Sequence, residues 1–172
     1  MNPLKKLLGQ TAIYGLSSIV GRLLNFLLVP LYTRYFTTVE YGETTILYAY
    51  VAFFVVILTY GMETAFFRFS HLETDKKKVY STTLLSILVS STLFMLVACF
   101  FSQEIANAIR FGDHPEYIKY FALIIGLDAI SSISFAKLRQ QNKAVRFALI
   151  RLLNIFINIG LNLFFIIYSD FA

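Results

Sequence analysis

The sequence contains few charged residues, a single cysteine and two isolated histidines. Only 15% of its 172 residues are charged, whereas a soluble domain would carry roughly 25%. With 58% hydrophobic residues, the apolar surface is too large for one small core and must face lipid. Cys99 has no second cysteine for an intramolecular disulfide, and it suits a small buried apolar position. His71 and His114 have no Cys or His at ligand spacing, so a metal site is not expected.

Motifs for chemistry are also missing. The sequence has no nucleophile–base pair at a plausible site, no phosphate-binding glycine loop and no zinc motif, so we expect neither an enzyme nor a bound cofactor. Aromatic residues do not interleave with the basic clusters as a nucleic-acid surface would require. The net charge of +5 is explained instead by basic cytoplasmic loops of a membrane protein. The expected class is an integral membrane protein.

Five apolar stretches are each near the roughly 20 residues needed to cross a bilayer. The first follows two lysines as a signal peptide would, but it is too long for one and lacks a small-residue cleavage site. The sequence therefore predicts an all-α membrane protein with about five transmembrane helices, forming a single bundle over residues 1–172. The expected spans are residues 9–32, 44–67, 79–103, 117–136 and 144–168.

The distribution of Lys and Arg over alternate loops predicts the orientation in the membrane. Ten basic residues fall on the side of the N-terminus and three on the other. We therefore expect a cytoplasmic N-terminus, with the first and fifth spans both crossing outward. The ten are Lys5, Lys6, Arg68, Lys76, Lys77, Lys78, Lys137, Arg139, Lys143 and Arg146; the three are Arg34, Arg110 and Lys119.

Two of the spans carry aligned polar residues. Arg22 lies in the middle of the first span, where an arginine costs about 2.5–3.5 kcal/mol on insertion scales and therefore tends to face a cavity, a partner or a substrate. At about 100° per residue, Thr11, Tyr14, Ser18, Gly21, Arg22 and Asn25 share one face of that helix. Arg151, Asn154, Asn158 and Asn162 share one face of the fifth span. These two faces are the candidate substrate-binding surface. The alternatives are a structural role for Arg22 and, for Arg151, a side chain that extends to the nearby cytoplasmic interface.

Acidic residues supply possible counter-charges. Asp128 lies near the centre of the fourth span, and intramembrane charges usually pair with one another, so a contact with Arg22 or Arg151 is expected. A structural ion pair that fixes helix packing is the alternative role for Asp128. Glu63 and Arg68 lie toward the inner end of the second span, as candidates for ion pairing or ion coupling or for a purely interfacial role.

Three stretches resemble bacterial polysaccharide flippases of the multidrug, oligosaccharidyl-lipid and polysaccharide exporter superfamily. The first span ends in Pro-Leu-Tyr-Thr-Arg (Pro30–Arg34) before a polar turn that closes in Tyr41-Gly42. The other two stretches are Tyr60–Phe69 (YGMETAFFRF) and Phe135–Ile155 (FAKLRQQNKAVRFALIRLLNI). The likeness covers essentially the whole chain.

The resemblance implies translocation of an undecaprenyl-diphosphate-linked oligosaccharide across the bacterial cytoplasmic membrane by alternating access. Cationic residues would face the anionic diphosphate, and Arg22 is the position that the resemblance carries over first. Such proteins have about twelve to fourteen spans in two lobes. Five spans thus resemble an incomplete N-terminal lobe, and we expect a fragment whose partner is the missing C-terminal lobe. The alternatives are a cation-coupled multidrug exporter of the same superfamily, or a small non-transporting membrane protein.

Overall fold

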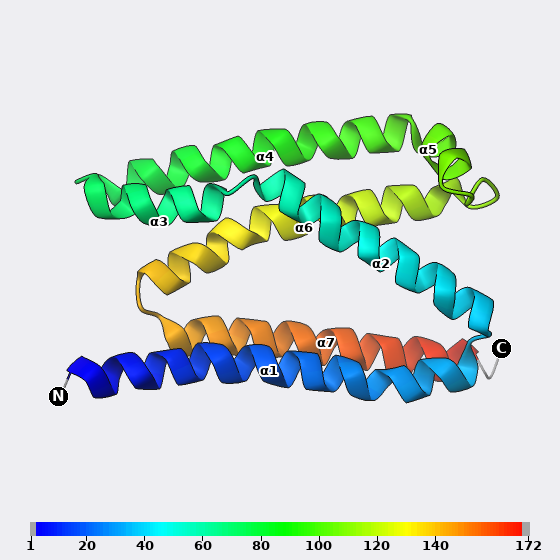
Figure 1. The fold of residues 1–172 in the computed structure, drawn as a ribbon, viewed down its shortest axis with the longest axis horizontal. Helices are drawn as coiled ribbons and strands as arrows, with labels where there is room; N and C mark the ends of the chain where they lie inside the picture. The colour runs from blue at the N-terminus through cyan, green and yellow to red at the C-terminus, as the bar shows by residue number, and fades with distance from the viewer. Residues whose placement is uncertain (1–2, 170–172) are drawn as a thin grey trace. The chain divides into compact units, whose positions relative to one another are not determined.

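Helices are the regular secondary structure in the part of the chain that the structure describes, and no strand is found there. The computed structural model describes the backbone of residues 3–169 and the side chains of residues 8–165 other than Gln10 and Asn25. Five stretches in this part are long and apolar enough to span a membrane, which confirms the predicted class. The helices (Figure 1) are α1 Pro3–Tyr35, α2 Thr38–Thr59, α3 Met62–Leu72, α4 Lys76–Phe100, α5 Ser102–Ala108, α6 Pro115–Gln140 and α7 Ala144–Ser169.

Two helices begin at side-chain caps. The backbone N–H of Thr37 donates to Glu40 Oε2 (2.8 Å) and that of Glu40 to Thr37 Oγ1 (3.4 Å). This reciprocal pair is a capping box, which satisfies two amide groups that the first turn of a helix leaves open. Asp75 Oδ1 accepts from the backbone N–H groups of Lys77 and Lys78 at 3.0 and 3.2 Å. Its carboxylate also offsets the lysines at the start of α4, where the helix dipole disfavours positive charge.

The chain forms two compact units, which are described separately. Unit 1 comprises Met1–Thr44 and Leu138–Ala172, and unit 2 comprises Thr45–Lys137. The core of unit 2 lies among α2, α4 and α6, where branched aliphatic side chains interlock around alanine. Its buried members are Val51, Leu58, Ile87, Ile125, Ala129 and Ile133.

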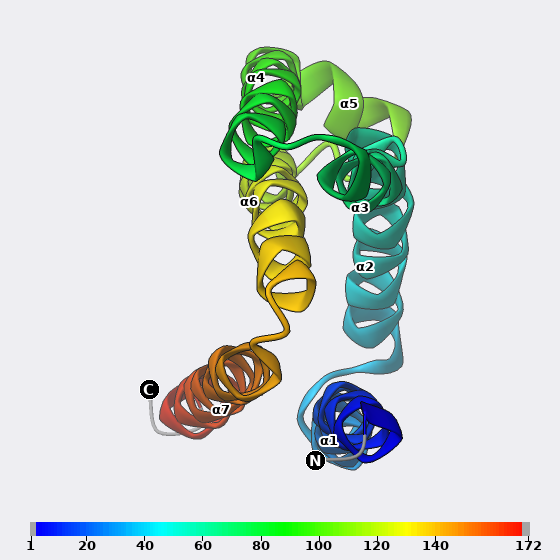
Figure 2. The same cartoon turned by 90° about the vertical axis from the view of Figure 1, so that its left-hand side faces the viewer.

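The second expected span is interrupted. The sequence predicts one helix over residues 44–67, but α2 ends at Thr59 and α3 begins at Met62. Tyr60 and Gly61 between them both have positive φ, 30° and 74°. The Tyr60 hydroxyl and Ser86 Oγ of α4 are hydrogen-bonded at 2.7 Å. α3 then lies alongside α4 (Figures 1 and 2), so the apolar stretch from Thr38 to Leu72 consists of two helical segments.

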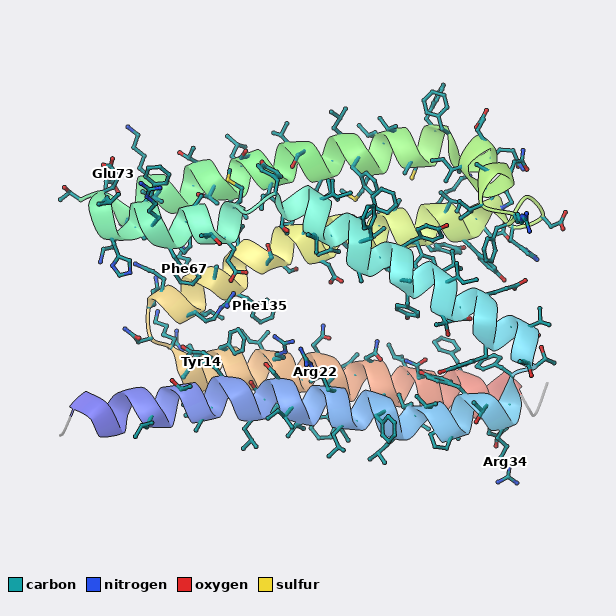
Figure 3. All side chains as sticks on the ribbon, viewed as in Figure 1. Tyr14, Arg22, Arg34, Phe67, Glu73 and Phe135 are labelled. Carbon is teal, nitrogen blue, oxygen red and sulfur yellow. The ribbon has the colours of Figure 1, made fainter. Side chains whose placement is uncertain are left out.

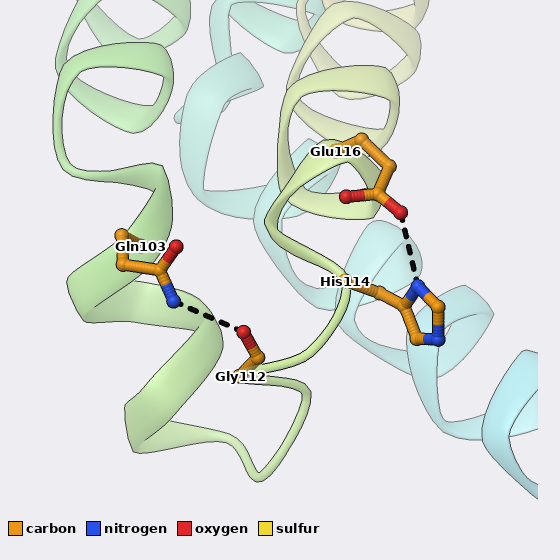
Figure 4. Close-up of polar contacts among 4 residues, drawn as sticks. All are labelled: Gln103, Gly112, His114 and Glu116. Atoms are coloured by element: carbon orange, nitrogen blue, oxygen red, sulfur yellow. Dashed lines mark hydrogen bonds and ion pairs between the residues drawn. The ribbon is translucent and has the colours of Figure 1, made fainter.

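The connection between α4 and α6 contains a short helix, α5, which covers the last residues of the expected third span and the residues after it. α5 is followed by a turn in which Gln103 Nε2 donates to the carbonyl oxygen of Gly112 at 3.0 Å (Figure 4). His114 Nδ1 and Glu116 Oε1 lie 3.0 Å apart at the start of α6. The first contact joins α5 to the turn that follows it, and the second lies at the start of α6.

In unit 1, α1 and α7 lie side by side and run in the same direction (Figures 1 and 2). A tight turn after α6 leads into α7. The backbone N–H of Asn142 donates to the carbonyl oxygen of Arg139 (3.0 Å) and that of Lys143 to Leu138 (2.9 Å). With Asn142 at φ 55°, this is a Schellman motif, in which a left-handed residue closes a helix.

Candidate functional site

The register of α1 against α7 follows from two contacts. The rings of Tyr14 and Phe147 meet edge to face with centroids 5.1 Å apart. About two turns after Tyr14 on α1, a Cβ added to Gly21 would lie 2.7 Å from Ile155 Cδ1. Glycine therefore lets the two helices approach closely at this level, as small residues do between membrane helices. Both contacts relate positions about 133 residues apart, as expected of two parallel helices.

The polar stripe of α1 begins at the line of contacts that α1 makes with α7 through Tyr14 and Gly21, and it extends to one side of that line. At about 100° per residue, Gly21 faces α7 and Arg22 lies about 100° around the helix. Arg22 is exposed, that is, not covered by protein. Arg22 and Arg34 extend from different sides of α1 (Figure 3). The backbone position of Asn25 falls between Gly21 and Arg22 in angle, and its side chain lies outside the described part of the chain.

The polar stripe of α7 lies on the opposite angular flank of its own contact line. Relative to Ile155, Arg151 is offset by about 40°, Asn158 by about 60° and Asn154 by about 100° in the sense opposite to that of Arg22. When two parallel helices face each other, residues rotated in opposite directions from the two contact points lie on the same side of the pair. The two predicted polar faces therefore meet on one surface, here called the polar flank, which comprises Thr11, Ser18, Arg22, Arg151, Asn154 and Asn158.

Few of these polar groups are satisfied by one another. Asn162 Nδ2 donates to the carbonyl oxygen (2.8 Å) and to Oδ1 (3.1 Å) of Asn158. Arg151, Asn154 and Asn158 are exposed. Within residues 3–169, the structure records no carboxylate in an ion pair with Arg22 or Arg151. Two guanidinium groups on this surface are therefore not neutralised by a carboxylate of the described residues.

The net charge of the chain resides entirely in unit 1. This unit has eight basic and three acidic residues, a net charge of +5, whereas unit 2 has seven of each and is neutral. Its three acidic residues come after the helices in the sequence. Glu40 and Glu43 follow the end of α1, and Asp170 follows the end of α7. The helical part of unit 1 from residue 8 to 35 and from 138 to 169 therefore contains basic residues and no acidic one. Such a surface attracts anions.

The three remaining candidates lie in unit 2. Asp128 is exposed on α6, and its neighbour Ala129 belongs to the core. Glu63 is partly buried in the first turn of α3, directly after the helix break, and Arg68 is exposed on the same helix. The expected contact of Asp128 with Arg22 or Arg151 would join the two units and stays a prediction. So do the pairing or coupling roles of Glu63 and Arg68.

Two features of possible functional weight were missed from the sequence. One is the break at Tyr60-Gly61. The apolar stretch from Thr38 to Leu72 has 35 residues, far more than the roughly 20 that a span needs, and this excess length could have indicated the break. The other is the environment of Phe147, where Arg139 and Arg151 both lie near one ring. No sequence signal pointed to it, because it depends on the turn between α6 and α7.

These observations define a multi-pass helical membrane protein with an anion-attracting polar surface along two parallel helices. The family model for polysaccharide biosynthesis proteins matches residues 7–168, which is nearly the whole chain. The chain therefore belongs to this family, as the resemblance of its three motif stretches predicted. Comparison with curated proteins and with solved structures finds no significant match.

Proposed function

We propose that this protein transports a lipid-linked oligosaccharide for polysaccharide biosynthesis, and that the polar flank of α1 and α7 lines its path across the bacterial cytoplasmic membrane. The carrying observation is the placement of Arg22 and Arg151 on one surface with three asparagines nearby. Among the described side chains, no carboxylate forms an ion pair with either arginine. Family membership supports a role in polysaccharide biosynthesis. The protein acts as a transporter and not as an enzyme in this proposal.

The chemistry of the flank suits a diphosphate joined to a sugar. Arginine stays charged in a low-dielectric setting and its planar fork binds two phosphate oxygens at once. Asparagine side chains offer both donors and acceptors, which match sugar hydroxyl groups. The polar flank would form one wall of the path, and further helices of the same protein would form the other, since alternating access needs two halves that rock against each other.

Replacement of Arg22 tests this proposal. Arg22→Gln in the native gene should reduce surface polysaccharide by about tenfold or more, because one charge-assisted hydrogen bond to a buried anion is worth about 1.5–3 kcal/mol. Arg34→Gln removes the same charge from another side of α1 and should leave polysaccharide unchanged. Surface polysaccharide is measured with protein abundance in the membrane. Wild-type polysaccharide in the Arg22→Gln strain would exclude Arg22 from the path.

A cation-coupled multidrug exporter is the second candidate. It is favoured by one observation, the exposed carboxylate of Asp128 on a membrane-spanning helix, because such groups commonly bind protons or other cations. Sensitivity to cationic drugs with and without the gene separates the two functions. The concentration of net positive charge in unit 1 favours an anionic substrate over a cationic one.

A further inference from the structure

Three asparagines follow one another along α7 at the spacing of about one helical turn. Asn154, Asn158 and Asn162 are each separated by four residues, which is about 6 Å along a helix that rises 1.5 Å per residue. Asn154 and Asn158 are exposed, and Asn162 is partly buried. An amide group that faces hydrocarbon without a hydrogen-bond partner is costly, so three in succession indicate a polar neighbour. These three residues are called the amide ladder.

Asn158 and Asn162 orient each other's amide groups. The backbone carbonyl oxygen of Asn158 can only accept a hydrogen bond, so Asn162 Nδ2 is the atom that donates to it at 2.8 Å. The same Nδ2 donates to Asn158 Oδ1 at 3.1 Å. This arrangement leaves Asn158 Nδ2 as a donor and Asn162 Oδ1 as an acceptor for other partners. The ladder thus offers both kinds of group, and a sugar hydroxyl both donates and accepts.

The guanidinium and amide groups follow a fixed order along the α1–α7 pair. Relative to the level at which Gly21 meets Ile155, Arg151 lies about 6 Å nearer the N-terminal end of the pair. Arg22 lies about 1.5 Å beyond that level and Asn162 about 10.5 Å beyond it. The amide groups therefore continue for about 9 Å past the last guanidinium of the polar flank.

The sequence repeats this order in the two helices. The tetrapeptide Arg-Leu-Leu-Asn occurs at residues 22–25 and again at residues 151–154, and α1 and α7 run in the same direction (Figures 1 and 2). In each copy the asparagine follows the arginine by about 4.5 Å along the helix axis. Both helices thus have the arginine first and the asparagine next, in the direction from their N-terminal to their C-terminal ends.

We propose that the amide ladder recognises the sugar of the transported molecule and thereby determines which oligosaccharide is carried. The proposal rests on the proposed function, because it places the diphosphate at Arg22 and Arg151. The sugar then points toward the C-terminal ends of α1 and α7, and the diphosphate toward their N-terminal ends. A step of about 6 Å between asparagines is of the order of one sugar ring, so successive asparagines face successive rings. Since amides are uncharged, the ligand class is a neutral sugar rich in hydroxyl groups.

Binding of two matched probes to the purified full chain tests the ladder. Each probe is a diphosphate that carries a farnesyl chain at one end and a six-membered ring at the other, either N-acetylglucosamine or cyclohexane. The two have the same charge and differ in the hydrogen-bonding groups of the ring. Affinities are measured by calorimetry in an uncharged detergent without sugar groups. The wild-type chain should prefer the sugar probe about tenfold or more, the scale expected of two neutral hydrogen bonds.

Three variants assign this preference to residues. Asn158→Leu removes the central amide and should reduce the preference to about threefold or less. Arg22→Gln should weaken the binding of both probes by a similar factor and leave the preference intact, because the arginine contacts the diphosphate that the probes share. Phe156→Leu is the matched control, since Phe156 is exposed on the other side of the α1 contact line from Asn158. It should change neither affinity by more than about twofold.

Two results would overturn the proposal. One is a wild-type chain that binds the two probes equally or binds neither. The other is an unchanged preference in Asn158→Leu, which would identify the ladder as a surface that packs against another membrane helix. Circular dichroism shows whether each variant keeps the wild-type helix content. If Asn158→Leu does not, Asn154→Leu takes its place in both tests, because Asn154 lies outside the bond between Asn158 and Asn162.

Failure of the ladder is distinguishable from failure of the proposed function. If Arg22→Gln lowers surface polysaccharide but the wild-type chain does not discriminate between the probes, the transport path stands and the ladder does not. If the Arg22→Gln strain makes normal polysaccharide while the chain still prefers the sugar probe, the path is wrong and the ladder remains a sugar-binding site.

Discussion

At the scale of single residues, Asn142 determines how the basic end of unit 1 is arranged. Its φ of 55° is a left-handed conformation that asparagine adopts far more readily than branched residues do. Asn142→Val should therefore destabilise the fold by about 1–2 kcal/mol, which lowers the unfolding temperature by about 2–4 °C per kcal/mol in a chain of this size. Thermal unfolding of the purified chain in detergent measures the change.

The neighbouring Gln141 provides the control. It is exposed in the same turn and is not among the residues with positive φ, so Gln141→Val should shift the midpoint by much less. Equal shifts in the two variants would show that the left-handed conformation of Asn142 is not what stabilises the turn.

The candidate site was predictable only in part at this scale. The alignment of Arg22 with Gly21, and of Arg151 with Asn154 and Asn158, follows from the helical repeat alone, so the sequence was sufficient to predict it. That both stripes lie on one side of the pair required the register of α1 on α7. The proximity of Arg139 to Phe147 depends on the backbone of the three-residue connection between α6 and α7, residues 141–143, which helical periodicity does not describe.

At the scale of helices, the break between α2 and α3 depends on Gly61. Its φ of 74° disfavours any residue with a Cβ, although such a Cβ would meet no other atom within 4 Å. Gly61→Ala should therefore destabilise the chain by about 1 kcal/mol through the backbone alone. Gly42→Ala is the matched control, because Gly42 lies inside α2 with the same open surroundings and alanine in a helix is favoured over glycine by about 1 kcal/mol.

The two alanine variants should thus shift the unfolding midpoint in opposite directions, Gly61→Ala downward and Gly42→Ala upward. A stabilising Gly61→Ala would mean that residues 38–72 form one continuous helix. Helices interrupted within a membrane are tolerated only where protein or water satisfies the open backbone groups. Tyr60, bonded to Ser86 on α4, anchors one side of it.

Hydrophobic patterning predicted the spans well because bilayer thickness sets how long an apolar helix must be. It did not predict the break, since Tyr60 and Gly61 are both apolar enough to continue the run, and a glycine in a membrane helix is ordinary. Backbone conformation, not hydrophobicity, separates α2 from α3. The caps at Thr37 and Asp75, by contrast, can be recognised in the sequence, as Thr-x-x-Glu and as an Asp before the helix.

At the scale of the whole molecule, charge is segregated along the chain. Unit 1 carries the entire net charge of +5 while unit 2 is neutral, so an anion would be drawn to the α1–α7 pair and not to the molecule in general. The attraction should weaken with added salt, because exposed charges are screened over about 8 Å at physiological ionic strength. Charges on the polar flank that lie within the membrane would be screened less.

The distribution of Lys and Arg over alternate loops predicts the orientation of the chain in the membrane. With ten basic residues on one side and three on the other, the loop between α3 and α4 should lie in the cytoplasm and the connection between α5 and α6 outside.

In a Cys99→Ser background, Lys77→Cys and Asp113→Cys each place one thiol on an exposed position of these two connections. A membrane-impermeant maleimide should label the Asp113→Cys protein in intact spheroplasts, and the Lys77→Cys protein only after the membrane is permeabilised. The reverse pattern would place the N-terminus outside, and with it the basic end of unit 1. Labelling of both thiols from one side would mean that α4 does not cross the membrane.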